Sequence, residues 1–501
     1  MKSFRLKNIK SFLDSKEIEL APITIFVGKN SCGKSSLLRF PAVLSQTFMF
    51  PSGSPINLFG GKVDYGNYDE VLNKLSRNGL IEFSVTYPID MKLIASYNQI
   101  IHKMYRKGKN DFKDVRLSVS FSKKNRHIIV EKLMIEINNK EFYKIEKMKN
   151  NTYSFLIKML CGENEISNSE HEVILENTLF DKMFPVYDPS GLVSKVGRDI
   201  FGTKWNDEYN RFLGKMTQTD ILQTLFPEEY SRFEEILLNY NLGAELLRAL
   251  YNCINFEAGY THYIGPFRIS PSRMYRDTQF FSNDVGIGGE NSSTILFNDY
   301  KEKKESNKDI SNALNDILGV NLDIKELGDE TGVYQIIIKD QNGIESNLID
   351  TGYGISQILP IVVQLLRNEI PPKQVIAHGV ILQALRSLIL IEQPELHLHP
   401  AAQAAVAELL VKCLQNSNKL KKQILIETHS EHLIRKLQVL VAKGKLPVSD
   451  LKIYYVDKNE QGIASVEEME LLDNGKFKKA WKTGFFDQSF ELTMELLNAE
   501  C

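Results

Sequence analysis

A glycine-rich segment near the N-terminus places the strongest constraint on how this chain folds. Residues 23–40 read ITIFVGKNSCGKSSLLRF, in which an apolar run leads to Gly28 and then to Gly33, Lys34 and Ser35. This is the GxxxxGK[ST] pattern, in the order of strand, loop and helix that it requires. In such a loop the backbone N–H groups and the lysine bind the phosphates, and the serine hydroxyl binds Mg²⁺. We therefore predict an α/β protein with a nucleotide-binding loop, the alternative being a purely structural turn. The predicted loop comprises Gly28, Lys29, Asn30, Ser31, Cys32, Gly33, Lys34, Ser35 and Ser36.

Two later apolar runs also end in polar side chains. They are SLILIEQPE at residues 387–395 and KKQILIETHSEHLI at residues 421–434. The carboxyl ends of parallel strands are the edge at which such sheets bind ligands. Glu392 is therefore expected to hold Mg²⁺ through water, and His429 to contact the γ-phosphate. The alternatives are a solvated acid for Glu392 and a hydrogen bond at the strand end for His429.

A third segment, DTGYGISQILPIVVQLL at residues 350–366, combines glycines with the start of a helix. The glycines free the backbone, Ser356 can cap the helix, and a helix start presents N–H groups and a positive dipole end to an anion. By itself this is an ordinary capped helix. Together with the other motifs it predicts a second phosphate contact, made by Gly352, Gly354, Ser356 and Gln357.

Composition narrows the class of protein. The chain has 501 residues, 43% of them hydrophobic, and 61 Lys and Arg against 63 Asp and Glu give a net charge of -2, so no global charge favours nucleic acid or an anionic membrane. The five cysteines are scattered and form no CxxC pair, which predicts free thiols. No apolar run is long enough for a signal peptide or a membrane span, so a cytoplasmic protein is expected. Local basic clusters are either solvated loops or contacts with DNA or a protein partner: Lys103, Arg106, Lys107, Lys109, Lys123, Lys124 and Arg126.

The chain divides into two regions that carry the motifs, with an insert between them. In the insert, LIEFSVTY, VRLSVSF and HIIVEKLMIEIN predict antiparallel strands, and the pattern from residue 205 to 256 is helical. The predicted parts are an N-terminal ATPase half with the phosphate loop at 1–75, a β-rich and then helical insert at 76–260, a C-terminal ATPase half at 261–440 and a strand and tail region at 441–501.

The order of these motifs resembles a known group of proteins. It resembles the ABC-type ATPase heads of the SMC, RecF and OLD-nuclease group, over about residues 1–70 and 260–440. The resemblance is carried by FRLKNIKSFLDSKEIELAPITIFVGKNSCGKSS, the glycine–serine–glutamine segment, the strand with PELHLHP and the final THS. More narrowly, three segments resemble a bacterial family of AAA-family ATPases that is known mainly as a domain of unknown function: YIGPFRISPSR, IEQPELHLHP and WKTGFFDQSFE. Members of that family often stand in anti-phage defence loci beside a nuclease or another effector.

This resemblance implies a composite site. In the group, ATP lies between the phosphate loop of one subunit and the glycine–serine segment of the other, which implies a homodimer, or a higher homo-oligomer of dimers, with Ser356 acting in trans. It also implies catalytic roles for Glu392, Gln393, Glu395 and His429, and ATP and Mg²⁺ as cofactors. The OLD-type nuclease domain is not expected, because no Asp-x-Asp pair follows His429.

One position departs from the pattern. The residue after the metal-binding acid is usually a glutamate that polarises the attacking water, and here it is Gln393, which accepts no proton at neutral pH. Either Gln393 or Glu395 then handles the water, and hydrolysis is expected to be slow.

Three functions follow as hypotheses. The first is a slowly hydrolysing ATPase that dimerises on ATP and serves as the sensor or regulatory subunit of a separate effector, a nuclease, in anti-phage defence. The second is a nucleotide-bound scaffold without turnover, and the third is a RecF-like DNA repair ATPase. The sequence does not distinguish ATP from GTP, since it contains no legible base-contact motif.

Overall fold

A central six-stranded sheet organises the molecule. The computed structural model describes residues 1–50, 53–88, 114–148, 152–161, 165–176, 180–185, 196, 198–200, 227–328, 331–367, 386–415, 421–479, 481 and 494–495. The order of the strands in this sheet is β13 (Thr261–Ile264), β18 (Arg386–Glu392), β19 (Lys421–Glu427), β4 (Ile23–Gly28), β20 (Leu451–Lys458) and β21 (Ala464–Glu468). Neighbouring strands from β13 to β20 pair in parallel, and β21 pairs antiparallel to β20.

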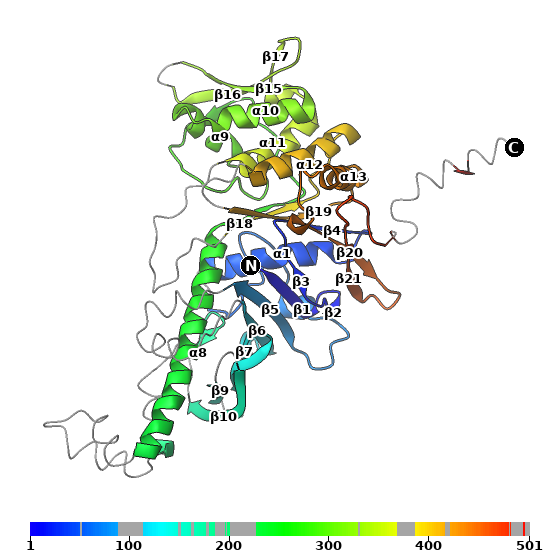
Figure 1. The fold of residues 1–501 in the computed structure, drawn as a ribbon. Coiled ribbons are helices and arrows are strands. Elements are labelled where there is room, and N and C mark those ends of the chain that lie inside the picture. Colours follow the sequence, from blue (N-terminus) through cyan, green and yellow to red (C-terminus); the bar gives the residue numbers. More distant parts are fainter. Residues whose placement is uncertain are drawn as a thin grey trace.

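Both faces of this sheet are buried, which explains why its strands are almost continuously apolar. Along β18, Leu388 and Leu390 belong to one hydrophobic core, while Ile389 and Ile391 belong to the other. Helix α1 (Lys34–Met49) covers the first face, and helices that include α11 to α13 cover the second (Figure 1). The sheet thus lies between two helical layers, and the predicted α/β fold is confirmed.

A large antiparallel sheet packs on the other side of α1, because Phe4 and Leu6 share a core with Leu37 and Phe40 of the helix. Its strand order is β10, β9, β8, β7, β6, β5, β1 and β2, with β3 also paired to β1. The strands are β1 (Ser3–Ile9), β2 (Phe12–Asp14), β3 (Ile18–Glu19), β5 (Ile81–Pro88), β6 (Asp114–Lys124), β7 (His127–Ile137), β8 (Lys140–Lys147), β9 (Thr152–Cys161) and β10 (Glu165–Glu176). Strands of the predicted insert and of the N-terminal half therefore share one sheet, and the predicted boundary at residue 76 stays a prediction.

Within the predicted helical segment, residues 205–256, the described residues belong to one long helix. Helix α8 (Pro227–Gly259) has 33 residues, hence a length of about 50 Å, and runs beside α1, β9 and β18 (Figure 1). The predicted helical segment began at residue 205, and residues 205–226 lie outside the described part of the chain. Two short strands, β11 (Phe180–Asp181) and β12 (Phe184–Pro185), and the short helix α2 (Tyr68–Val71) complete this region.

The remaining elements build the layer over the second face of the central sheet (Figure 1). Its helices are α9 (Ser292–Lys301), α10 (Ser306–Leu318), α11 (Tyr353–Leu366), α12 (Pro400–Gln415) and α13 (Glu431–Ala442). A small sheet contains β14 (Tyr275–Arg276), β15 (Asn321–Glu326), β16 (Val333–Lys339) and β17 (Glu345–Asn347), and 3-10 turns cover Leu348–Asp350 and Val448–Asp450. None of the helices in the described ranges combines the length and the apolar character that crossing a bilayer requires.

Candidate nucleotide site

The predicted phosphate loop joins β4 to α1, as its sequence requires. Gly28 has φ 149° and Gly33 has φ 114°, values that favour glycine. A Cβ at Gly28 would lie 2.1 Å from the carbonyl oxygen of Val456 on β20, so a side chain cannot fit there. Helix α1 then begins at Lys34, without an acidic residue in its first turn. The N–H groups at the start of α1 and its positive dipole end therefore face an anion that enters the loop.

Lys34 lies inside the loop rather than in solvent. Its ammonium donates hydrogen bonds to the carbonyl oxygens of Gly28 at 3.1 Å and Lys29 at 2.8 Å, and the residue is only 3% exposed. A buried ammonium needs such partners, because desolvation of an unpaired charge is costly. The loop carbonyl oxygens thus hold the Lys34 ammonium inside the predicted phosphate loop.

Glu392 ends β18 and is bound by two side chains from other elements. Arg39 on α1 donates from Nε to Oε1 at 2.5 Å and from Nη2 to Oε2 at 2.9 Å, and the Tyr263 hydroxyl donates to Oε1 at 2.8 Å. These hydrogen bonds to Glu392 raise the pKa of Arg39, and burial raises the pKa of Tyr263. Both carboxylate oxygens are therefore already engaged by protein donors.

Glu427, which the sequence interpretation missed, ends the neighbouring strand β19. It pairs in register with Glu392 on one side and with Phe26 of β4 on the other. Its Oε1 lies 3.8 Å from the Lys34 ammonium, and its Oε2 has no hydrogen-bond partner in the part of the chain that the structure describes. Burial raises the pKa of Glu427, and hydrogen bonding with the Ser35 hydroxyl lowers it in part. The sequence did contain a signal for this acid, since QILIE, like SLILIE, is an apolar run that ends in glutamate. The prediction chose His429 instead, because of the THS that follows.

The backbone after Glu392 is unusual. Gln393 has φ 45°, a left-handed value that is uncommon outside glycine, and strain of this kind clusters at functional sites. Its N–H donates to the Glu427 carbonyl oxygen at 2.8 Å. Arg268 donates to the carbonyl oxygens of Glu392 at 2.7 Å and Gln393 at 3.2 Å. A buried guanidinium and the adjacent strand thus hold this turn in place.

Glu395 connects this turn to the segment after β19. One of its oxygens accepts from the Thr428 hydroxyl at 2.8 Å and the other from the His429 N–H at 2.7 Å. Burial raises the pKa of Glu395, and the two hydrogen bonds oppose this shift. The carboxylate therefore already serves as an acceptor for the chain that leads into α13, so its predicted role toward water stays a prediction.

His429 lies between β19 and α13, at the same edge of the sheet as Lys34. Ser430 caps α13 by accepting from the Leu433 N–H. Burial lowers the pKa of His429 to about 4, and the charge of Lys34 adds to the shift. The imidazole is therefore neutral near pH 7, with one ring nitrogen able to donate a hydrogen bond to a phosphate.

The segment with Ser356 forms the start of α11, but the predicted cap is wrong. Gly352 is the N-cap residue, and the Ser356 hydroxyl lies within the first turn, where it donates to the Tyr353 carbonyl oxygen at 2.9 Å. Ser356 and Gln357 are buried, at 8% and 5% exposure. Gly354 lets the helix approach the turn after Glu395, because a Cβ there would lie 3.0 Å from the His397 carbonyl oxygen.

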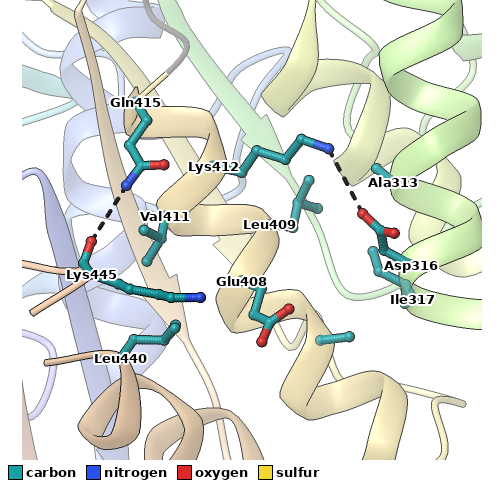
Figure 2. A pocket seen from close by; sticks show the side chains of 11 residues that line it. Ala313, Asp316, Ile317, Glu408, Leu409, Val411, Lys412, Gln415, Leu440 and Lys445 are labelled. Atoms are coloured by element: carbon teal, nitrogen blue, oxygen red, sulfur yellow. Dashed lines mark hydrogen bonds and ion pairs between the residues drawn. The ribbon is translucent and has the colours of Figure 1, made fainter. Parts of the chain in front are cut away.

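Some predicted features fall elsewhere. The basic residues from 103 to 109 lie outside the described ranges, and Lys123 forms an ion pair with Asp69. A pocket of about 210 Å³ opens between α10, α12 and α13, where Lys412 faces Asp316 and Gln415 reaches Lys445 (Figure 2). None of the residues that line it belongs to the phosphate loop or to the turn after β18. It is therefore separate from the candidate nucleotide site.

Part of the chain matches a known family of ATPase domains. Residues 277–434 match the family model of the AAA ATPase domain. The matched AAA region includes Ser356, Glu392, Glu427 and His429, and the phosphate loop lies before it. No curated protein matches the chain.

Similar solved structures are SMC head domains. One, from Pyrococcus furiosus and bound to the C-terminal domain of ScpA, has 11% identity and a TM-score of 0.38, and the match covers 99% of this chain and 98% of that one. The SMC head domain from Thermotoga maritima has 9% identity and a TM-score of 0.37, with 94% and 99% covered. The fold described above rests on the sheet order and the phosphate loop rather than on these scores.

Proposed function

We propose that the chain is an ABC-type ATPase that binds ATP and hydrolyses it slowly. The observation that carries this proposal is the convergence of the phosphate loop, the buried Lys34 and the ends of β18 and β19 at one edge of the parallel sheet. Ligands bind at this edge in open α/β sheets. Loop N–H groups and the start of α1 would bind the phosphates, and Lys34 would exchange its carbonyl partners for phosphate oxygens.

The residues also fit a divalent cation. The Ser35 hydroxyl and a buried carboxylate oxygen of Glu427 without a partner among the described residues are hard oxygen ligands of the kind that Mg²⁺ prefers. When bound with the nucleotide, Mg²⁺ would supply charge neutralisation at the β- and γ-phosphates.

Slow hydrolysis follows from the side chains around Gln393. Its amide can orient a water molecule but cannot take its proton. Glu395 accepts hydrogen bonds on both oxygens, and Glu392 is bound by Arg39 and Tyr263. Loss of a general base costs about 10²–10⁴ in rate. A long-lived ATP state suits a switch better than a motor.

The switch would act through assembly. We place the N-terminus of α11, with Gly352, Gly354, Ser356 and Gln357, against the nucleotide of a second copy, so that ATP closes a homodimer that can build higher oligomers. Support comes from Tyr353, which is 62% exposed at this helix start and open to a partner. We propose that this chain controls a separate effector, a nuclease, in anti-phage defence.

The nucleotide-bound scaffold is the second candidate, because the same engaged carboxylates would also suit a site without turnover. Phosphate release from the purified chain with ATP and Mg²⁺ separates the two. Slow phosphate release by the parent supports the ATPase if Lys34→Ala abolishes both this release and nucleotide binding, since Lys34 is the buried cation of the loop. Lys443→Ala, a change of an exposed lysine after α13, is the matched control and should keep both activities. Nucleotide affinity of Lys34→Ala equal to that of the parent would refute the phosphate-loop assignment.

A further inference from the structure

We propose that Glu427, rather than Glu392, is the acidic side chain that holds the nucleotide-bound divalent cation together with Ser35. This inference rests on the proposed nucleotide binding and assigns the metal site within it. It changes the sequence-based expectation, in which the acid at the end of β18 has that role.

Strand order favours Glu427. Strand β19 lies directly beside β4, which leads into the phosphate loop, whereas β18 is one strand further away. Glu427 pairs in register with Phe26, two residues before Gly28. Its Oε1 lies 3.8 Å from the Lys34 ammonium, and its carboxylate interacts with the Ser35 hydroxyl. Glu427 thus faces the two side chains of the loop that a phosphate-bound cation would lie between.

Glu392 is committed elsewhere. Both of its oxygens accept from Arg39, and one also accepts from Tyr263. Withdrawing the carboxylate toward a metal would leave the guanidinium, whose side chain is only 32% exposed, without its partner. Breaking a buried pair in this way is strongly unfavourable. Glu392 is therefore a positioning residue that ties the end of β18 to α1.

Glu427 has an oxygen that needs a partner. The residue is 5% exposed, and its Oε2 is buried without a hydrogen bond among the described residues. The Lys34 ammonium does not fulfil this need, because its hydrogen bonds go to Gly28 and Lys29. A buried carboxylate oxygen without a partner is costly, and a cation or one of its water ligands would satisfy it.

The number of protein ligands also fits. Mg²⁺ in nucleotide sites is bound through one or two protein side chains, with phosphate oxygens and waters as the other ligands. No cluster of three or more His, Cys, Asp or Glu suited to a metal occurs in the described residues. A cation at Ser35 and Glu427 would therefore depend on the nucleotide, and binding of metal and nucleotide should be coupled.

The experiment measures this coupling in the full chain. Mant-AMPPNP, a fluorescent and non-hydrolysable ATP analogue, is titrated in EDTA and then over a Mg²⁺ series, and Mn²⁺ bound with the analogue is counted by EPR. Glu427→Gln should keep the affinity in EDTA and raise the Mg²⁺ concentration for half-saturation about 10- to 100-fold, as loss of a supporting carboxylate does. Glu427→Asp, which keeps the charge, should give an intermediate value. Glu408→Gln, a change of an exposed acid on α12 that pairs with Lys436, is the matched control.

The outcomes separate the two proposals. A parental Mg²⁺ dependence in Glu427→Gln, with folding verified by its thermal melt, overturns the assignment. A larger Mg²⁺ effect in Glu392→Gln than in Glu427→Gln also overturns it and restores the acid of β18 as the ligand. A parent chain that binds no analogue in either buffer refutes the proposed function itself, and the metal site with it.

Discussion

The guanidinium of Arg39 donates to both carboxylate oxygens of Glu392, across 353 positions of sequence. The pair joins α1, which follows the phosphate loop, to the last residue of β18. A change in either partner should therefore be felt both in the stability of the fold and at the candidate site.

Arg39→Ala should destabilise the chain, because it leaves the buried Glu392 carboxylate with Tyr263 as its sole side-chain donor among the described residues. Loss of one partner of a buried pair costs about 3–5 kcal/mol, and partial exposure of Arg39 puts the expected loss at the lower end. Urea denaturation measures it. The matched control is Arg273→Ala, which removes an equally bidentate but exposed pair with Asp350 and should cause no measurable loss. An Arg39→Ala chain as stable as the parent would show that the Arg39 pair has no structural role.

Gln393→Glu should accelerate phosphate release by about 10²-fold or more, because it places a proton acceptor where only an amide is present. The measurement is single-turnover phosphate release with ATP and Mg²⁺. Glu395→Gln should instead lower the melting temperature, since it removes an acceptor from the Thr428 hydroxyl or the His429 N–H. If Gln393→Glu is no faster and Glu395→Gln has no turnover, Glu395 is the working base and the slow switch is wrong.

Gly352→Arg should block ATP-dependent dimerisation and leave nucleotide binding by the monomer intact. A Cβ at Gly352 meets no atom within 4 Å, so the substitution fits the monomer, whereas Ser356 is too buried for a bulky replacement. The arginine would project at the helix start that we place against the second subunit. Light scattering with and without ATP decides this, with Gly53→Arg as the control because a Cβ there also meets no atom within 4 Å. A Gly352→Arg chain that still dimerises on ATP contradicts the trans role.

Asp14 should make stability depend on pH in the acid range. Burial would raise its pKa, but hydrogen bonds from Arg5, one of them at 2.8 Å, and from the Lys16 N–H outweigh this and lower the pKa to about 2, from 3.8. Between these values the unfolded chain binds the proton first, so the contribution of Asp14 is complete above pH 3.8 and is lost as the pH falls toward 2. The pair is partly exposed, which limits the contribution to about 1 kcal/mol.

Denaturation of the parent and of Asp14→Asn at several pH values tests this. The difference in unfolding free energy should close as the pH falls from 4 to 2. Asp473→Asn, in an exposed turn, is the control. A difference that stays constant over this range would mean that the ion pair with Arg5 adds nothing.

What the sequence alone determined about this protein is local or periodic. The phosphate loop could be predicted because GxxxxGK[ST] acts through its own backbone, and Gly28 and Gly33 adopt the φ values that this loop requires. Apolar runs that end in Glu392 and before His429 predicted buried parallel strands, since such strands are covered on both faces. These features need no knowledge of distant residues.

Only the tertiary structure decided which side chains meet. Register between β18, β19 and β4 places Glu427 opposite Glu392 on one side and opposite Phe26, two residues before Gly28, on the other, although β4 is far from β18 and β19 in the sequence. The partners of Glu392 on α1 and β13, and those of Glu395 after β19, are likewise set by packing. A single sequence records how each residue suits its own segment, whereas the pairing of distant charges depends on how the segments pack in three dimensions. For this reason the sequence shows the acids of the site, but only the structure shows which carboxylates accept hydrogen bonds from other side chains and which have an oxygen without a partner among the described residues.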